Sequence, residues 1–228
     1  MSITTRRGDS GETDLLFGCR VKKSYPRIDV IGCVDELNAA LGLVRVTGKT
    51  DYSTREVHKI QLTLIALMGE LATPPGEEER YAASHPQRVN ADSVDYLDVL
   101  VSDLEMAGAL KFHGWALPGA AGSLGGAHAD VARTVCRRAE RCVVLLEGTP
   151  EAVPNADIVR YLNRLSDVLC LSPGLKKKEV AGRKRLPQAR LEHDVSAFPF
   201  LLDRSGRLRH HTRCRAVGGG PGFQERFP

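Results

Sequence analysis

Apolar residues recur every three or four positions along most of the first 171 residues, which is the spacing of one helix face. The spacing is clear at Val34, Leu37, Leu41 and Val44, and it returns in four later segments. The pattern predicts five amphipathic helices, over residues 32–46, 54–72, 90–107, 121–147 and 155–171. The stripe expected in the fourth helix consists of Val131, Val135, Ala139, Cys142 and Leu146.

Stretches rich in glycine and proline separate the five segments: GKTDYS, TPPGEEER, ALPGAAG and GTPEAVPN. Such residues end helices and form turns. No segment alternates apolar and polar residues over a length that would favour a strand. We therefore predict an all-α fold, an antiparallel five-helix bundle preceded by a glycine-rich N-terminal loop.

The apolar pattern stops at Leu171. Residues 172–228 hold 13 basic and 5 acidic residues, whereas residues 1–171 hold 19 and 23. We predict a helical domain over residues 1–171 and a divergent, basic, disordered tail over 172–228. Out-of-frame translation of G/C-rich DNA would give the same composition, so a frameshifted tail is an alternative. Binding of nucleic acid by the tail is a weaker one, since only composition favours it.

The composition also limits the function. No apolar run reaches the ~18 residues that cross a bilayer, and the six cysteines lack the spacing of a zinc site. We expect a cytoplasmic protein with reduced thiols, with no membrane association and no metal held by the chain alone.

The segment ADVARTVCRRAERCVVLL carries a charged face. Arg133, Arg137 and Arg141 recur at i, i+4 and i+8, with Arg138 and Glu140 beside them. Like charges on one face repel unless an anion lies against them, and guanidinium groups match phosphate oxygens. The segment therefore indicates either a phosphate-binding face or a solvated one.

Polar residues also lie beside the apolar stripes of two other helices. Asn163 and Asp167 stand at i and i+4 in YLNRLSD, and Asp35 lies in GCVDELNAALG, as a surface residue or as the partner of a facing arginine. The loop TRRGDSGETDLLFG has accessible backbone N–H groups at its glycines, and Lys23 follows it. We interpret these groups as one polar seam at a helix–helix or subunit junction, suited to a polyphosphate.

In this order, TRRGDSGET, GCVDELNAALG, ALPG, RTVCRRAER and YLNRLSD resemble the PduO-type ATP:cob(I)alamin adenosyltransferases, the corrinoid adenosyltransferases. The resemblance covers residues 3–171 and implies a five-helix bundle that forms homotrimers with active sites between subunits. It implies transfer of the 5′-deoxyadenosyl group of ATP to the Co(I) of cobalamin or a related corrinoid, with Mg²⁺ and with release of tripolyphosphate. A cobalamin reductase and a B12-dependent enzyme would be partners.

The resemblance also implies roles for individual residues. The implied ATP-binding residues are Thr5, Arg6, Arg7, Gly8, Thr13, Asp14, Lys23, Arg137, Arg138, Glu140, Arg141 and Asn163. The implied catalytic residues are Arg137, Glu140, Arg141 and Asp167. Trp115 and Asp167 would lie on the corrin side, and Asp35 and Arg133 would form a salt bridge between subunits. Because cobalt itself would be the nucleophile, no Ser, Cys or His nucleophile is expected.

The resemblance ends where relatives continue their last helix, because Pro173 and Gly174 would terminate it here. This departure leaves two alternative functions. One is a catalytically impaired ATP-binding bundle with a regulatory or cofactor-delivery role. The other is a nucleic-acid-binding protein that acts through the basic tail.

Overall fold

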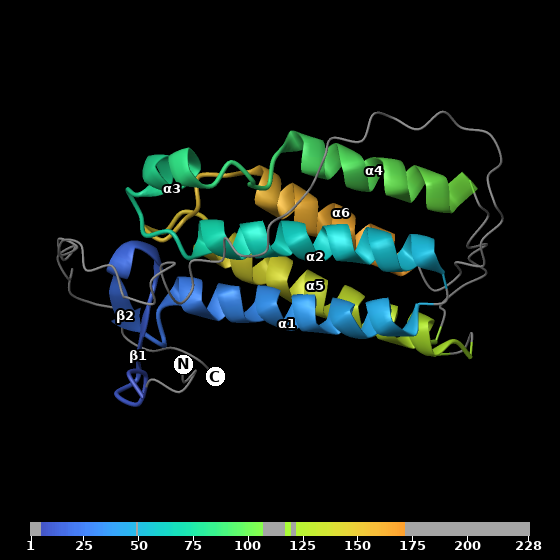
Figure 1. Ribbon diagram of the computed structural model, residues 1–228, viewed down its shortest axis with the longest axis horizontal. Helices are drawn as coiled ribbons and strands as arrows, with labels where there is room; N and C mark the ends of the chain where they lie inside the picture. Colours follow the sequence, from blue (N-terminus) through green and yellow to red (C-terminus); the bar gives the residue numbers. More distant parts are fainter. Residues whose placement is uncertain (1–5, 49, 107–116, 120–121, 172–228) are drawn as a thin grey trace.

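The computed structural model describes residues 6–48, 50–106, 117–119 and 122–171 (Figure 1). Its elements are β1 (Glu12–Asp14), β2 (Arg20–Lys22), α1 (Pro26–Thr47), α2 (Asp51–Leu71), α3 (Glu78–Ser84), α4 (Ala91–Met106), α5 (Leu124–Leu146) and α6 (Asp157–Leu171). Thr5, Trp115 and the tail 172–228 lie outside the described residues, so the predicted division of the chain after residue 171 stays a prediction.

The five long helices pack side by side, and the described fold is mostly helical, as the sequence predicted (Figure 1). α1 packs against α2 and α5, and α6 packs against α5 and α4. Their facing sides form one apolar core, in which Leu37, Leu64, Leu97 and Leu165 are fully buried. Burial of this kind of surface is the main force that holds such a bundle together. None of the described helices is both long and apolar enough to span a membrane.

The predicted number of helices was wrong, because the described residues contain six helices. The sixth is α3, which lies partly in the glycine- and proline-containing stretch TPPGEEER that was interpreted as a separator between helices. It is only seven residues long and buries one side chain, Tyr81, so it shows no repeating apolar stripe. A side chain at Gly69 of α2 would overlap the Tyr81 hydroxyl, which shows how closely α3 packs there.

The N-terminal loop contains a hairpin, which the sequence did not predict. β1 pairs antiparallel with β2, and Asp14 lies opposite Arg20. Strands of three residues are too short to show alternation. The Leu16 backbone N–H donates to the Ala72 carbonyl oxygen at 2.9 Å. This bond fixes the hairpin at the end of the bundle where α1 begins and α2 ends (Figure 1).

The stripe predicted for α5 is confirmed at Val135, Ala139 and Leu146, but not at its other two positions. Val131 is 52% exposed, and Cys142 is only half-buried. The full set of residues that α5 buries is Gly126, Ala129, Ala132, Val135, Cys136, Ala139, Val143 and Leu146. Most of these are small, so the backbones of α1 and α5 approach closely. At Gly125 a Cβ would lie 3.1 Å from the Thr47 carbonyl oxygen on α1.

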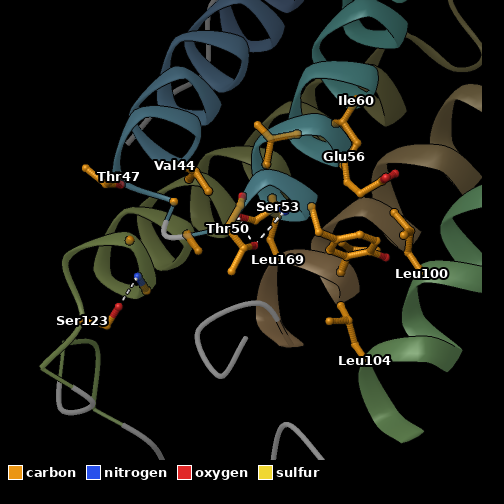
Figure 2. Close-up of a pocket in the computed structure, with 17 residues that line it drawn as sticks. Val44, Thr47, Thr50, Ser53, Glu56, Ile60, Leu100, Leu104, Ser123 and Leu169 are labelled. Carbon is orange, nitrogen blue, oxygen red and sulfur yellow. Dashed lines mark hydrogen bonds between the residues drawn. The ribbon is translucent and has the colours of Figure 1, made fainter. Parts of the chain in front are cut away.

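A mostly apolar pocket of about 110 Å³ opens at the other end of the bundle, where α1 ends and α2 begins. Figure 2 shows side chains from all five long helices around it, including Val44, Ile60, Leu100 and Leu169. The Glu56 carboxylate reaches this pocket and accepts a hydrogen bond from the Tyr96 hydroxyl. The two ends of the bundle therefore differ: one carries the polar hairpin, and the other an apolar opening.

Candidate functional site

Arg20 organises the N-terminal hairpin. Its guanidinium donates to the Glu12 carboxylate at 2.9 Å, to the Asp14 carboxylate at 3.0 Å and to the Arg7 carbonyl oxygen at 2.5 Å. These two carboxylates raise the pKa of Arg20 further above its usual value. Sequence reasoning gave Arg20 no role, because its position opposite Asp14 becomes visible only once the strand register is known.

The structure brings Lys23 and Gly8 together, as expected for a phosphate-binding loop. A Cβ at Gly8 would lie 3.2 Å from Lys23 Nζ, so the absence of a side chain at Gly8 leaves room for this ammonium group. The Lys23 backbone N–H also donates to the Gly11 carbonyl oxygen at 2.8 Å. Arg6 and Arg7 are exposed, and Thr13 lies in β1 beside Asp14. The loop thus carries several cations on an exposed, glycine-containing backbone.

Buried Arg27 anchors the start of α1 directly behind this loop. It is fully buried and donates to the Glu151 carbonyl oxygen at 2.9 Å, to the Ala152 carbonyl oxygen at 2.8 Å and to the Thr73 carbonyl oxygen. Burial lowers the pKa of Arg27, and the Tyr25 hydroxyl and the Glu151 carboxylate oppose that shift. Arg27 therefore joins three parts of the fold, the start of α1, the end of α2 and the α5–α6 connection.

The predicted arginine stripe on α5 is divided among three directions. Arg138 forms an ion pair with Glu36 of α1, and this contact raises the pKa of Arg138. Glu140 turns to α6 and accepts a hydrogen bond from Asn163 Nδ2 at 3.0 Å. Arg137 and Arg141 are exposed. The helix thus offers two exposed guanidinium groups beside a paired carboxylate and carboxamide.

Asp167, one turn beyond Asn163 on α6, is held by Arg164. Arg164 Nη1 lies 3.0 Å from the Asp167 carboxylate, and Arg164 Nε contacts the Asp98 carboxylate of α4. The Asp167 side chain remains 47% exposed. The sequence indicated Asp167 but not its support from Asp98, because α4 and α6 are distant in the chain.

The predicted Asp35–Arg133 pair is not made within the described part of this chain. Asp35 is exposed on α1, and Arg133 pairs with Asp130 one turn earlier on α5 at 3.2 Å. Within the same residues, no hydrogen bond or ion pair joins the loop over residues 6–23 to Arg137, Arg141 or Asn163. One subunit therefore presents two separate polar sets.

A metal site built from the chain alone finds no support in residues 6–48, 50–106, 117–119 and 122–171. Nowhere in these ranges do three or more His, Cys, Asp or Glu side chains gather in a way that could hold an ion. The Glu12 and Asp14 carboxylates of the hairpin are both engaged by Arg20.

Comparison with known proteins decides the family. A sequence model of the family described as cobalamin adenosyltransferase matches residues 3–172. The chain belongs to this family. The match spans the hairpin, α5 and α6, and it confirms the resemblance drawn from the sequence motifs.

Relatives in the cobalamin adenosyltransferase family are moderately similar. The chain is 36% identical over 172 residues to the corrinoid adenosyltransferases PduO of Citrobacter freundii and Salmonella typhimurium, a match that covers 74% of this chain. It spans about half the length of these relatives, 48% of each. It is 40% identical over 168 residues to a cobalamin adenosyltransferase of Cupriavidus metallidurans, covering 73% of this chain and 83% of the relative.

A solved structure has the same fold. It is a variant PduO-type ATP:corrinoid adenosyltransferase from Lactobacillus reuteri, complexed with cobalamin and ATP. The TM-score is 0.65 at 29% identity, and the match covers 76% of this chain and 92% of that one. The fold shared with this structure therefore covers about three quarters of this chain.

Proposed function

We propose that this chain transfers the 5′-deoxyadenosyl group of ATP to the cobalt of a reduced corrinoid such as cob(I)alamin. The observation that carries the proposal is the family match over residues 3–172, which includes every candidate residue. The names of the relatives state this activity, and the L. reuteri protein binds both ligands. The reaction gives adenosylcobalamin and tripolyphosphate.

The positive groups suit the leaving group. When Co(I) of the substrate attacks C5′ of ATP, the C5′–O bond breaks and its electron pair leaves with the triphosphate. Arg7, Lys23 and the backbone around Gly8 would bind the phosphates, while Arg137 and Arg141 would stabilise their developing charge. No proton is transferred in this step, so no general base is required.

The α5–α6 face suits the nucleoside and the corrin. Glu140 engages the carboxamide nitrogen of Asn163, which leaves the carboxamide oxygen to accept from a ribose or adenine group. Asp167, oriented by Arg164, would face the corrinoid. Trp115 stays a prediction for the corrin side, since it lies outside the described residues.

Mg²⁺ would enter with ATP. Magnesium usually binds through substrate phosphates, one or two carboxylates and water. We place Mg²⁺ on the triphosphate, where it would offset negative charge together with the arginines.

A homotrimer would join the two polar sets that one chain keeps apart. The outer face of α1 carries exposed Asp35, with Leu43 49% exposed and Val46 75% exposed. Exposed apolar residues around a charge are typical of a subunit interface. We propose that Asp35 pairs with Arg133 of a neighbouring subunit, and that the N-terminal loop of one subunit meets α5 and α6 of another.

The activity test uses MgATP and chemically reduced cobalamin. We expect the Co(I) absorption spectrum to convert to that of adenosylcobalamin, with release of one tripolyphosphate per turnover. Arg141→Lys should lose most of this activity, whereas Arg55→Lys, at an exposed arginine of α2, should keep it.

ATP binding without turnover would contradict the proposal and favour the catalytically impaired ATP-binding bundle. Salt-sensitive DNA binding that is lost on truncation after Leu171 would favour the alternative of a nucleic-acid-binding protein that acts through the basic tail. The two protein partners, a cobalamin reductase and a B12-dependent enzyme that would receive the product, stay predictions.

A further inference from the structure

We propose that Cys33 and Cys142 are a site of reversible disulfide formation that links α1 to α5. Their Sγ atoms lie 3.5 Å apart although the residues are 109 positions apart in the chain. Both side chains are half-buried, so small oxidants and reductants can reach them. The inference goes beyond the proposed adenosyl transfer and does not depend on it.

The helices hold the two sulfurs in position from both sides. One turn along each helix, Glu36 of α1 and Arg138 of α5 form an ion pair across the same junction. Towards the other end of the junction, a Cβ at Gly125 would lie only 3.1 Å from the Thr47 carbonyl oxygen. A disulfide bond is about 2.05 Å long. Side-chain rotation and a small approach of two helices already in close contact would therefore close the gap.

Cys136, on the same helix α5, is a useful contrast. It is fully buried, and its thiol donates to the Leu162 carbonyl oxygen at 3.2 Å. A buried thiol with a backbone partner is structural and inert towards oxidants. Cys33 and Cys142, in contrast, are both partly accessible to solvent and lie close to each other.

The reaction balances with a small disulfide such as oxidised glutathione. One protein thiolate attacks the small disulfide, forms a mixed disulfide and releases one glutathione thiol. The second cysteine then attacks the protein sulfur of the mixed disulfide and releases the second glutathione. Two protein thiols are oxidised and one glutathione disulfide is reduced to two thiols. Dithiothreitol reverses the sequence.

The disulfide would restrain the fold at the junction between α1 and α5. It would close a loop of about 110 residues, which constrains the unfolded chain strongly. It would also fix α1 to α5 beside Arg138, next to the exposed arginines of the candidate site. We expect the oxidised protein to melt about 5–15 °C higher than the reduced protein.

The test treats the purified full chain with oxidised glutathione, blocks remaining thiols by alkylation and maps peptides without reduction. We expect one cross-linked peptide pair, Cys33 with Cys142 from the same chain, that dithiothreitol removes. Cys33→Ser and Cys142→Ser should each abolish it, whereas Cys170→Ser should leave it. Mixed glutathione adducts alone, cross-links between chains, or cross-links to other cysteines would overturn the proposal. None of these outcomes bears on adenosyl transfer, which uses neither thiol.

Discussion

Arg20 shows how one residue can order a loop that has little regular structure. It gathers two carboxylates and one carbonyl oxygen from residues 7–14. Without it, Glu12 would lose its ion pair and Asp14 would keep only its contact with Arg7, beside the groups proposed to bind triphosphate. Its importance is therefore electrostatic as well as geometric.

We expect Arg20→Ala to weaken ATP binding severalfold, because the loop loses the guanidinium group that holds Glu12, Asp14 and the Arg7 carbonyl oxygen together. Isothermal titration calorimetry with MgATP measures the change. Arg55→Ala, which removes an arginine far from the hairpin, is the matched control. Equal affinity in Arg20→Ala and the unaltered protein would show that the loop is ordered in another way.

Glu70 is a buried carboxylate whose charge opposes folding. It is 5% exposed and accepts from the Val89 backbone N–H at 2.8 Å and from Asn155 Nδ2 at 2.7 Å. Burial raises the pKa of Glu70 despite these two donors. A carboxyl group whose pKa is higher in the folded state stabilises the fold at low pH, and this contribution is lost as pH rises through that pKa.

We therefore expect the unaltered protein to lose free energy of unfolding relative to Glu70→Gln as pH rises from about 4.5 towards 7. Urea unfolding of both proteins across this range measures the difference in their free energies of unfolding. The titration of all other groups is common to both proteins and cancels in that difference. A difference that does not change with pH, or that grows in favour of the unaltered protein, would contradict a raised pKa.

The elements divide into those that the sequence could predict and those that it could not. Five long helices follow from apolar spacing, since each buries a stripe over several turns. α3 and the hairpin are held by one small cluster, formed by Leu16, Ala72 and Tyr81, and so leave no periodic signal. The motifs assigned Lys23 and Gly8 to one phosphate-binding loop, and the structure places the two residues side by side. Arg20 and Arg27 were missed because their partners come from other elements, and the same holds for the contact of Arg164 with Asp98.

At the scale of elements, Arg27 connects the start of α1 to the end of α2 and to the α5–α6 connection. We expect Arg27→Met to lower the free energy of unfolding by about 3–5 kcal/mol, because it leaves buried carbonyl oxygens without donors. Arg27→Lys should recover only part of this loss, since an ammonium group cannot reproduce the planar fork. Urea denaturation measures both. If Arg27→Met lowered the free energy of unfolding by less than Arg55→Met, a substitution at an exposed arginine, Arg27 would not be an important connection.

At the scale of the whole molecule, one chain is polar at one end, apolar at the other, and charged along the α5–α6 face. Neither polar set resembles a complete ATP site by itself. The hairpin lies where α1 begins (Figure 1), whereas Arg137 and Arg141 lie in the second half of α5 and Asn163 in the first half of α6. Sequence motifs indicate which residues to test as a site, and the proposal that a second copy of the chain completes it rests on the separation of the two polar sets.

We expect Asp35→Arg to weaken assembly of the proposed trimer by about tenfold, since it places like charges opposite each other. Light scattering after size-exclusion chromatography measures the mass. The double variant Asp35→Arg, Arg133→Asp should restore assembly, because the pair is then reversed. An unchanged mass in the single variant, or no recovery in the double one, would contradict the proposed pair.

The contacts of Arg27 have a consequence for how this sequence can vary. Its acceptors at Thr73, Glu151 and Ala152 are main-chain carbonyl oxygens, which every residue type carries. Substitutions at Thr73 and Ala152 therefore keep the contact, and none of them can compensate for a change at Arg27. A comparison of many homologues should find position 27 nearly invariant and yet without covariation with the residues it holds. Methods that infer contacts from correlated substitution would miss this junction.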